Sequence, residues 1–65
     1  MLNYSEKLTK LRGNKSITTV AAAVGISASA LSMYECGKRV PRDEVKIALA
    51  NYYGKTVGWL FFDQE

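Results

Sequence analysis

The sequence predicts a small all-α domain, and three features of its 65 residues support this prediction. Apolar residues recur at the three- and four-residue spacing of an α-helix in four successive stretches. Each stretch ends at a glycine, and three of the four follow a side chain that can cap a helix. No stretch of useful length alternates apolar and polar residues as a β-strand does. A chain of this length is expected to form one domain, residues 1–65.

The first helix is expected between Asn3 and Gly13. Asn3 and Glu6 have the spacing of a capping box, in which each side chain accepts a hydrogen bond from the other residue's backbone amide. One face of this helix is apolar and consists of Tyr4, Leu8 and Leu11.

The next two helices are short and are predicted to pack as a pair. The first begins after Ser16 and ends at Gly25, and the second begins after Ser27 and ends at Gly37. Two helices joined by a three-residue turn containing glycine form a helix-turn-helix, whose second helix enters the major groove of DNA. The motif covers about residues 17–36, and its expected apolar contacts are Val20, Ala21, Val24, Ile26, Leu31 and Tyr34.

A fourth helix is expected after the basic connector 38–41. Asp43 and Glu44 suit its N-terminus because acidic groups there oppose the helix dipole, and Gly54 ends it. Thr56 is a candidate cap for a last turn. That turn belongs to an apolar segment, residues 56–62, whose large side chains are Val57, Trp59, Leu60, Phe61 and Phe62.

Composition excludes most catalytic and metal chemistry. The chain has no histidine and one cysteine, Cys36, so neither zinc-ligand spacings nor histidine-based nucleophilic sites can be formed. We expect no enzyme activity, no cofactor, no metal and no small-molecule ligand. Cys36 is expected to be a small surface or half-buried residue, with redox sensing as the alternative. Neither a membrane-spanning run nor a signal peptide is present, which predicts a cytoplasmic protein.

Charge is distributed unevenly along the chain. Up to Arg42, seven lysines and arginines oppose two glutamates, whereas from Asp43 onward two lysines oppose four acidic residues. The net charge is +3, and it is concentrated in the part that contains the predicted motif. A basic region of this kind favours a polyanionic partner, most simply nucleic acid.

Residues 16–41, SITTVAAAVGISASALSMYECGKRVP, resemble the Cro and phage-repressor (XRE-type) helix-turn-helix family. The likeness extends more loosely through YYGKTVGWLFF. It implies a lambda-repressor-like bundle of about five helices and a dimeric transcriptional regulator. Two positions depart from the family pattern, Ile17 where a polar residue is common and Cys36 where asparagine is common. The positions that match are Ala21, Gly25, Ile26-Ser27, Tyr34-Glu35, Gly37-Lys38 and Pro41.

Helical geometry and the motif select the residues expected to contact DNA. With Leu31 and Tyr34 directed inward, the base-facing candidates are Ala28, Ser29, Ser32 and Met33. None of them is arginine, glutamine or asparagine, so the side chains that form bidentate pairs with bases are absent from this face. The phosphate-contact candidates are Ser16, Thr18, Ser27, Lys38, Arg39 and Arg42, with Lys15 and Arg12 ranked lower.

The apolar side chains of segment 56–62 are too many for one turn to bury completely against the core. We expect a two-fold homodimer with Trp59, Phe61 and Phe62 in its interface, the alternative being that they only close the core. Together these expectations describe a Cro-like or prophage repressor that reads a palindromic double-stranded operator through half-sites one DNA turn apart. The alternative function is an antitoxin-like protein-interaction module that uses the apolar segment to bind another polypeptide.

Overall fold

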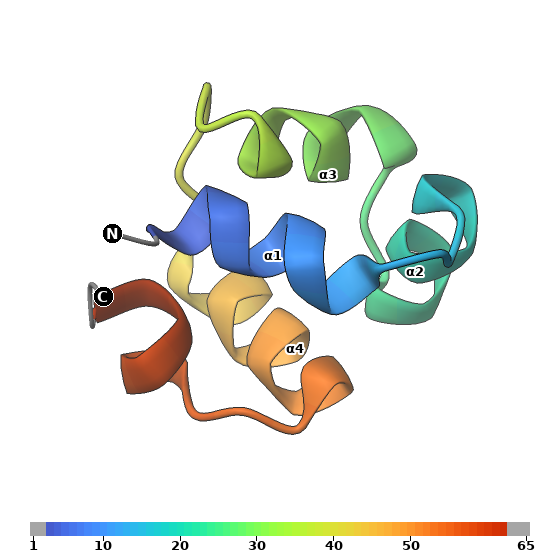
Figure 1. Ribbon diagram of the computed structural model, residues 1–65. Helices are drawn as coiled ribbons and strands as arrows, with labels where there is room; N and C mark the ends of the chain where they lie inside the picture. Colours follow the sequence, from blue (N-terminus) through green and yellow to red (C-terminus); the bar gives the residue numbers. More distant parts are fainter. Residues whose placement is uncertain (1–2, 63–65) are drawn as a thin grey trace.

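The computed structural model describes residues 3–62, and every regular element in this range is a helix. There are five: α1 (Tyr4–Arg12), α2 (Ile17–Val24), α3 (Ala28–Glu35), α4 (Asp43–Tyr53) and η1 (Gly58–Phe62). The helices pack into a body of 27 × 20 × 20 Å (Figure 1). The predicted all-α fold of about five helices is confirmed. None of the individual helices within residues 3–62 is both long and apolar enough to cross a lipid bilayer.

The helix boundaries follow the caps that the sequence predicts. Asn3 and Glu6 form both hydrogen bonds of a capping box at the start of α1. Thr56 likewise caps the last helix, since its Oγ1 accepts a hydrogen bond of 3.0 Å from the Trp59 amide. The last helix is, however, a five-residue π-helix rather than an α-helical turn.

All five helices contribute to one core. Each supplies one aliphatic side chain with no exposed surface, and these are Leu8, Val20, Leu31, Leu49 and Leu60. In Figure 1, α1 crosses the middle of the molecule between α3 above and α4 below, and α2 closes one end. The start of α1 lies beside the end of η1, where the Tyr4 and Phe61 ring centroids are 5.8 Å apart. Helix α3 therefore lies on the opposite side of α1 from the apolar C-terminal segment.

The hydroxyl of Tyr53 is buried in this core and has no hydrogen-bond partner among the described residues. Burial, followed by the negative charge of Glu35, raises the pKa of Tyr53 to about 12. An ordinary tyrosine in the unfolded chain ionises near pH 10. The folded state therefore holds the Tyr53 proton more tightly than the unfolded state does. The resulting stabilisation of the fold is complete below pH 10 and is lost as the pH rises from 10 to 12.

We expect Tyr53→Phe to leave the free energy of unfolding at pH 7 unchanged or raised by up to about 1 kcal/mol, because no hydrogen bond is lost. Between pH 10 and 11.5 the variant should lose less stability than the wild type. Urea unfolding at pH 7, 10 and 11.5 measures both effects, with Tyr52→Phe as the neighbouring control. A destabilised variant at pH 7 would reveal a polar partner for the hydroxyl.

Candidate nucleic-acid interface

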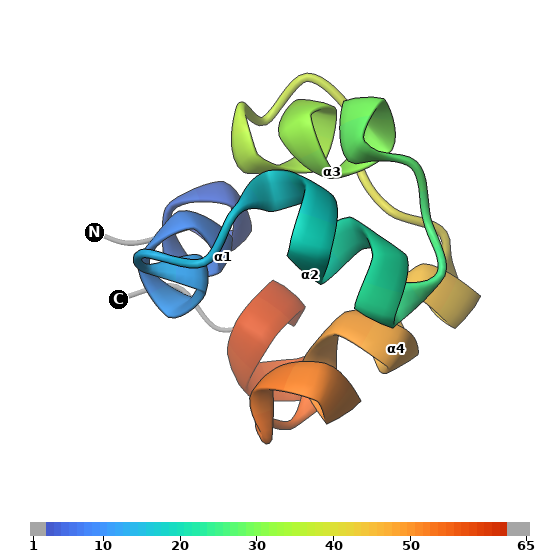
Figure 2. The ribbon, with the colours of Figure 1, turned by 90° about the vertical axis from the view of Figure 1, so that its right-hand side faces the viewer.

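Helices α2 and α3 have the geometry of a helix-turn-helix. Their axes are bent by 107° at the connection formed by residues 25–27, and the usual range for this motif is about 90–120°. Gly25 has a φ of 92°, and the carbonyl of Ala21 accepts hydrogen bonds of 2.9 and 3.0 Å from the Gly25 and Ile26 amides. Ala21 is 2% exposed and belongs to the buried core. Figure 2 shows α3 lying across the end of α2 on the outside of the bundle.

The outer face of α3 consists of uncharged side chains. Leu31 and Tyr34 are buried, whereas Ser29 and Ser32 are exposed. Met33 is half-buried, and at 100° per residue it shares the outward side of the helix with the two serines. Ala28 is also half-buried and packs against the core near the helix N-terminus. The structure thus brings the four predicted base-facing residues to one exposed side and its border.

The predicted phosphate-contact serines act as helix caps. Ser16 Oγ accepts a hydrogen bond of 3.0 Å from the Thr19 amide, and Ser27 Oγ accepts one of 3.0 Å from the Ala30 amide. Ser16 Oγ also donates to Thr19 Oγ1 at 2.7 Å. Both serines and Thr18 are exposed. Each short helix therefore presents an exposed, capped N-terminus, where the positive end of the helix dipole suits a phosphate.

The loop between α3 and α4 carries the exposed cations Lys38, Arg39 and Arg42. Its backbone is attached to the bundle: the Lys38 amide donates to the Met33 carbonyl at 3.0 Å, and the Tyr4 hydroxyl donates to the Arg39 carbonyl at 2.9 Å. Positive charge is therefore held beside the C-terminal end of α3 by the backbone, and the three side chains extend into solvent.

Arg12 is placed differently from the other predicted phosphate contacts. Its Nε donates to both carboxylate oxygens of Glu35, at 2.8 and 3.1 Å, and a terminal nitrogen donates to the Lys15 carbonyl at 2.8 Å. The hydrogen bond to Glu35 raises the pKa of Arg12 above its ordinary value. Arg12 thus joins α1 to α3, whereas Lys15 is exposed, with its ammonium 5.3 Å from the centroid of the Tyr52 ring.

Of the three predicted dimer residues, only Phe62 is largely exposed, at 66%. Trp59 and Phe61 are half-buried and pack against the core of their own chain. The carbonyl of Trp59 accepts a hydrogen bond of 2.6 Å from Nζ of Lys7, a lysine that is 1% exposed. This hydrogen bond of Lys7 therefore links η1 to α1, and the buried Lys7 does not contribute to the basic surface.

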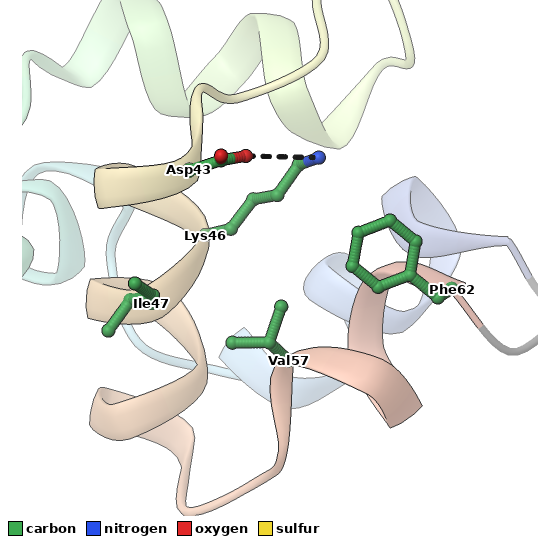
Figure 3. A pocket seen from close by; sticks show the side chains of 5 residues that line it. All are labelled: Asp43, Lys46, Ile47, Val57 and Phe62. Atoms are coloured by element: carbon green, nitrogen blue, oxygen red, sulfur yellow. Dashed lines mark ion pairs between the residues drawn. The ribbon is translucent and has the colours of Figure 1, made fainter.

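The structure reveals exposed apolar residues that sequence reasoning missed. Val40 is 65% exposed in the basic loop, and Ile47 is 51% exposed on α4. Ile47 helps to line an open pocket of about 380 Å³ between α4 and the C-terminal segment (Figure 3). We name this region the α4 pocket; its lining residues are Asp43, Lys46, Ile47, Val57 and Phe62. The exposure of Ile47 could have been predicted from one signal in the sequence. Helix α4 has an apolar inner side, and Ile47 is a further apolar residue on its outer side.

Residues 3–62 contain no group of three or more His, Cys, Asp or Glu side chains that could hold a metal ion. Cys36 is exposed immediately after α3. The groups that this surface presents are therefore hydroxyls, small apolar side chains, helix N-termini and lysine or arginine cations. These are the groups with which proteins contact DNA bases and phosphates.

Comparison with known proteins agrees with this geometry. A helix-turn-helix family model matches residues 7–60, which include all of α2, α3 and α4. Searches of curated proteins and of solved structures found no significant match. With the matched region covering most of the sequence, the chain belongs to the XRE-type helix-turn-helix family of DNA-binding regulators.

Proposed function

We propose that this protein is a cytoplasmic, Cro-like repressor, of phage or prophage type, that binds a palindromic operator as a homodimer. The observation that carries the proposal is the placement of exposed Ser29 and Ser32 on α3, with the cations of the following loop beside them. Serine hydroxyls and apolar groups contact bases in the major groove, whereas the loop cations contact phosphates. Occupation of a promoter by such a domain is sufficient to exclude other proteins from the same DNA.

The docking follows from the two helices. The N-terminal part of α3, with Ala28 and Ser29, enters the major groove, and α2 crosses the DNA backbone. Ser16 and Thr18 then place the N-terminus of α2 near one phosphate, while Lys38, Arg39 and Arg42 reach phosphates at the other end of α3. Contacts at both ends of the helix fix its register on the DNA, so that the side chains between them can distinguish bases.

The α4 pocket supports the homodimer. Ile47 and Phe62 are both more than half exposed, an unusual arrangement for large apolar side chains on so small a protein. Lys46 and Asp43 lie at the same rim, with Nζ and a carboxylate oxygen 3.9 Å apart. A two-fold axis would bring the same patch of two subunits together, so that Ile47 and Phe62 of one subunit could pack against those of the other. We therefore place the interface at the α4 pocket, with Phe62 as its main member and Trp59 and Phe61 behind it.

Charge placed in this patch is expected to dissociate the dimer. Ile47→Asp combined with Phe62→Asp removes two apolar side chains per subunit, each of which contributes about 1.5–3 kcal/mol when fully buried. We expect the dimer dissociation constant to rise at least about a hundredfold. Sedimentation equilibrium measures it, and Val40→Ser is the control for loss of an exposed apolar group elsewhere. A wild-type protein that stays monomeric at its working concentration would contradict this interface.

The proposed function is tested by selecting bound duplexes from a randomised library at two salt concentrations. We expect a palindrome with half-sites about 34–36 Å apart, one turn of DNA. The variant Ser29→Ala/Met33→Ala should enrich an altered sequence or none, since both residues lie on the outer side of α3. Salt-sensitive binding without any enriched sequence would refute sequence-specific recognition.

The α4 pocket also favours a second candidate function, an antitoxin-like module that binds a different polypeptide. An open apolar pocket lined by Ile47, Val57 and Phe62 can accept a foreign side chain as well as a second copy of this chain. Purification of the protein from its native cell distinguishes the two functions. A stoichiometric heterologous partner, lost in the Ile47→Asp/Phe62→Asp variant, would establish the module.

A further inference from the structure

Helix α3 brings no net charge to its outer face. Its only charged residue is Glu35, whose side chain is 7% exposed and accepts two hydrogen bonds from Nε of Arg12. The carboxylate is thus held against α1 and cannot accept a hydrogen bond from a cytosine amino group in the groove. Every cation assigned to the interface lies outside α3.

Met33 lies on this face and is not part of the hydrophobic core. It is half-buried, yet unlike Ala28 and Ala30 it is not among the residues that pack against the core within residues 3–62. It also lies one turn after Ser29 on the outward side of α3. Part of its flexible thioether chain is therefore available to an apolar group in the groove.

The chemistry of the major groove limits what such a face can distinguish. Arginine, lysine, asparagine and glutamine discriminate bases through bidentate hydrogen bonds, and the α3 sequence ASALSMYE contains none of them. A serine hydroxyl donates or accepts, so it tolerates several base edges. The remaining apolar feature of the groove is the 5-methyl group of thymine, which only an apolar side chain contacts favourably.

We propose that this protein recognises its operator mainly through thymine 5-methyl groups, with Met33 as a specificity-determining residue and Ala28 as the second methyl contact. The inference rests on the proposed function, because it requires α3 to lie in the major groove. It assigns affinity and discrimination to different residues: the loop cations bind phosphates of any sequence, and the apolar side chains of α3 select the bases.

The test replaces thymine by uracil, which deletes the 5-methyl group and leaves base pairing intact. Starting from the operator recovered by selection, each thymine is replaced in turn in both half-sites, and dissociation constants are measured at one salt concentration. Transfer of one methylene-sized group contributes about 0.8 kcal/mol, which is about fourfold in affinity for each methyl group. Replacement in both half-sites should therefore weaken binding by about 15-fold at the contacted positions.

The variant Met33→Ala identifies the contact. At one thymine per half-site, uracil replacement should weaken the wild type but leave Met33→Ala unchanged, whereas the matched variant Met33→Leu should keep the sensitivity. Because Met33 lies outside the core, circular dichroism should show that both variants fold. An operator bound equally tightly with thymine and with uracil overturns the methyl inference and leaves the proposed function standing. If selection enriches no operator, that result contradicts the proposed function, and it overturns the methyl inference as well because the inference rests on that function.

Discussion

Arg12→Ala is expected to destabilise the fold by about 2 kcal/mol, more than any other single surface substitution in α1. The change removes the Arg12 Nε donor, which lies 2.8 and 3.1 Å from the two carboxylate oxygens of the nearly buried Glu35 side chain. Removal of one partner from a fully buried ion pair costs about 3–5 kcal/mol, and we expect less here because the Arg12 side chain is 22% exposed. Thermal unfolding should show a midpoint lowered by about 10 °C, since 1 kcal/mol corresponds to about 4–8 °C in a domain of this size.

The control is Lys10→Ala, which removes a positive charge from an exposed position of the same helix. We expect its unfolding midpoint to stay within about 2 °C of the wild type. The sequence-based expectation for Arg12, a phosphate contact, leads to a different result. It predicts normal stability and a smaller salt dependence of DNA binding, because one phosphate contact per subunit would be lost. Thermal unfolding together with salt titration therefore separates the two roles.

Helix positions could be predicted because their signals are local. Asn3, Ser16 and Ser27 each cap the helix that follows, and Gly25 and Gly54 adopt positive φ at helix ends. A cap or a left-handed glycine depends on residues within four positions in the chain, so the sequence contains all of the necessary information. The helix-turn-helix was predictable for the same reason, since its two helices are adjacent in sequence.

The roles of individual charged residues could not be predicted because they depend on distant contacts. Lys7 is 52 positions from Trp59, whose carbonyl accepts its hydrogen bond, and Arg12 is 23 positions from Glu35. In the sequence both residues look like the exposed cations Lys38 and Arg39. Only the packing of α1 against η1 and α3 shows that they join helices. The exposure of Ile47 was missed because it depends on which sides of α4 the neighbouring helices leave uncovered.

The second large effect is expected from removing the loop cations. Lys38→Ala combined with Arg39→Ala deletes two predicted phosphate contacts per subunit, or four per dimer. Each phosphate contact contributes about 0.9 to the slope of log affinity against log salt. We therefore expect the slope to become shallower by about 3 to 4, and the affinity at 0.1 M salt to fall on the order of a thousandfold.

The loss should be nearly equal for the operator and for unrelated DNA, because phosphates are the same in both. The ratio of the two affinities, measured by competition at several salt concentrations, should consequently stay constant. Lys38→Arg combined with Arg39→Lys preserves both charges and should preserve the slope. The loop backbone is held by the Tyr4 hydroxyl at the Arg39 carbonyl, a contact that neither pair of substitutions removes. A double alanine variant that lost its preference for the operator but kept its salt slope would show that the loop reads bases, and would place Lys38 and Arg39 in a groove rather than on the backbone.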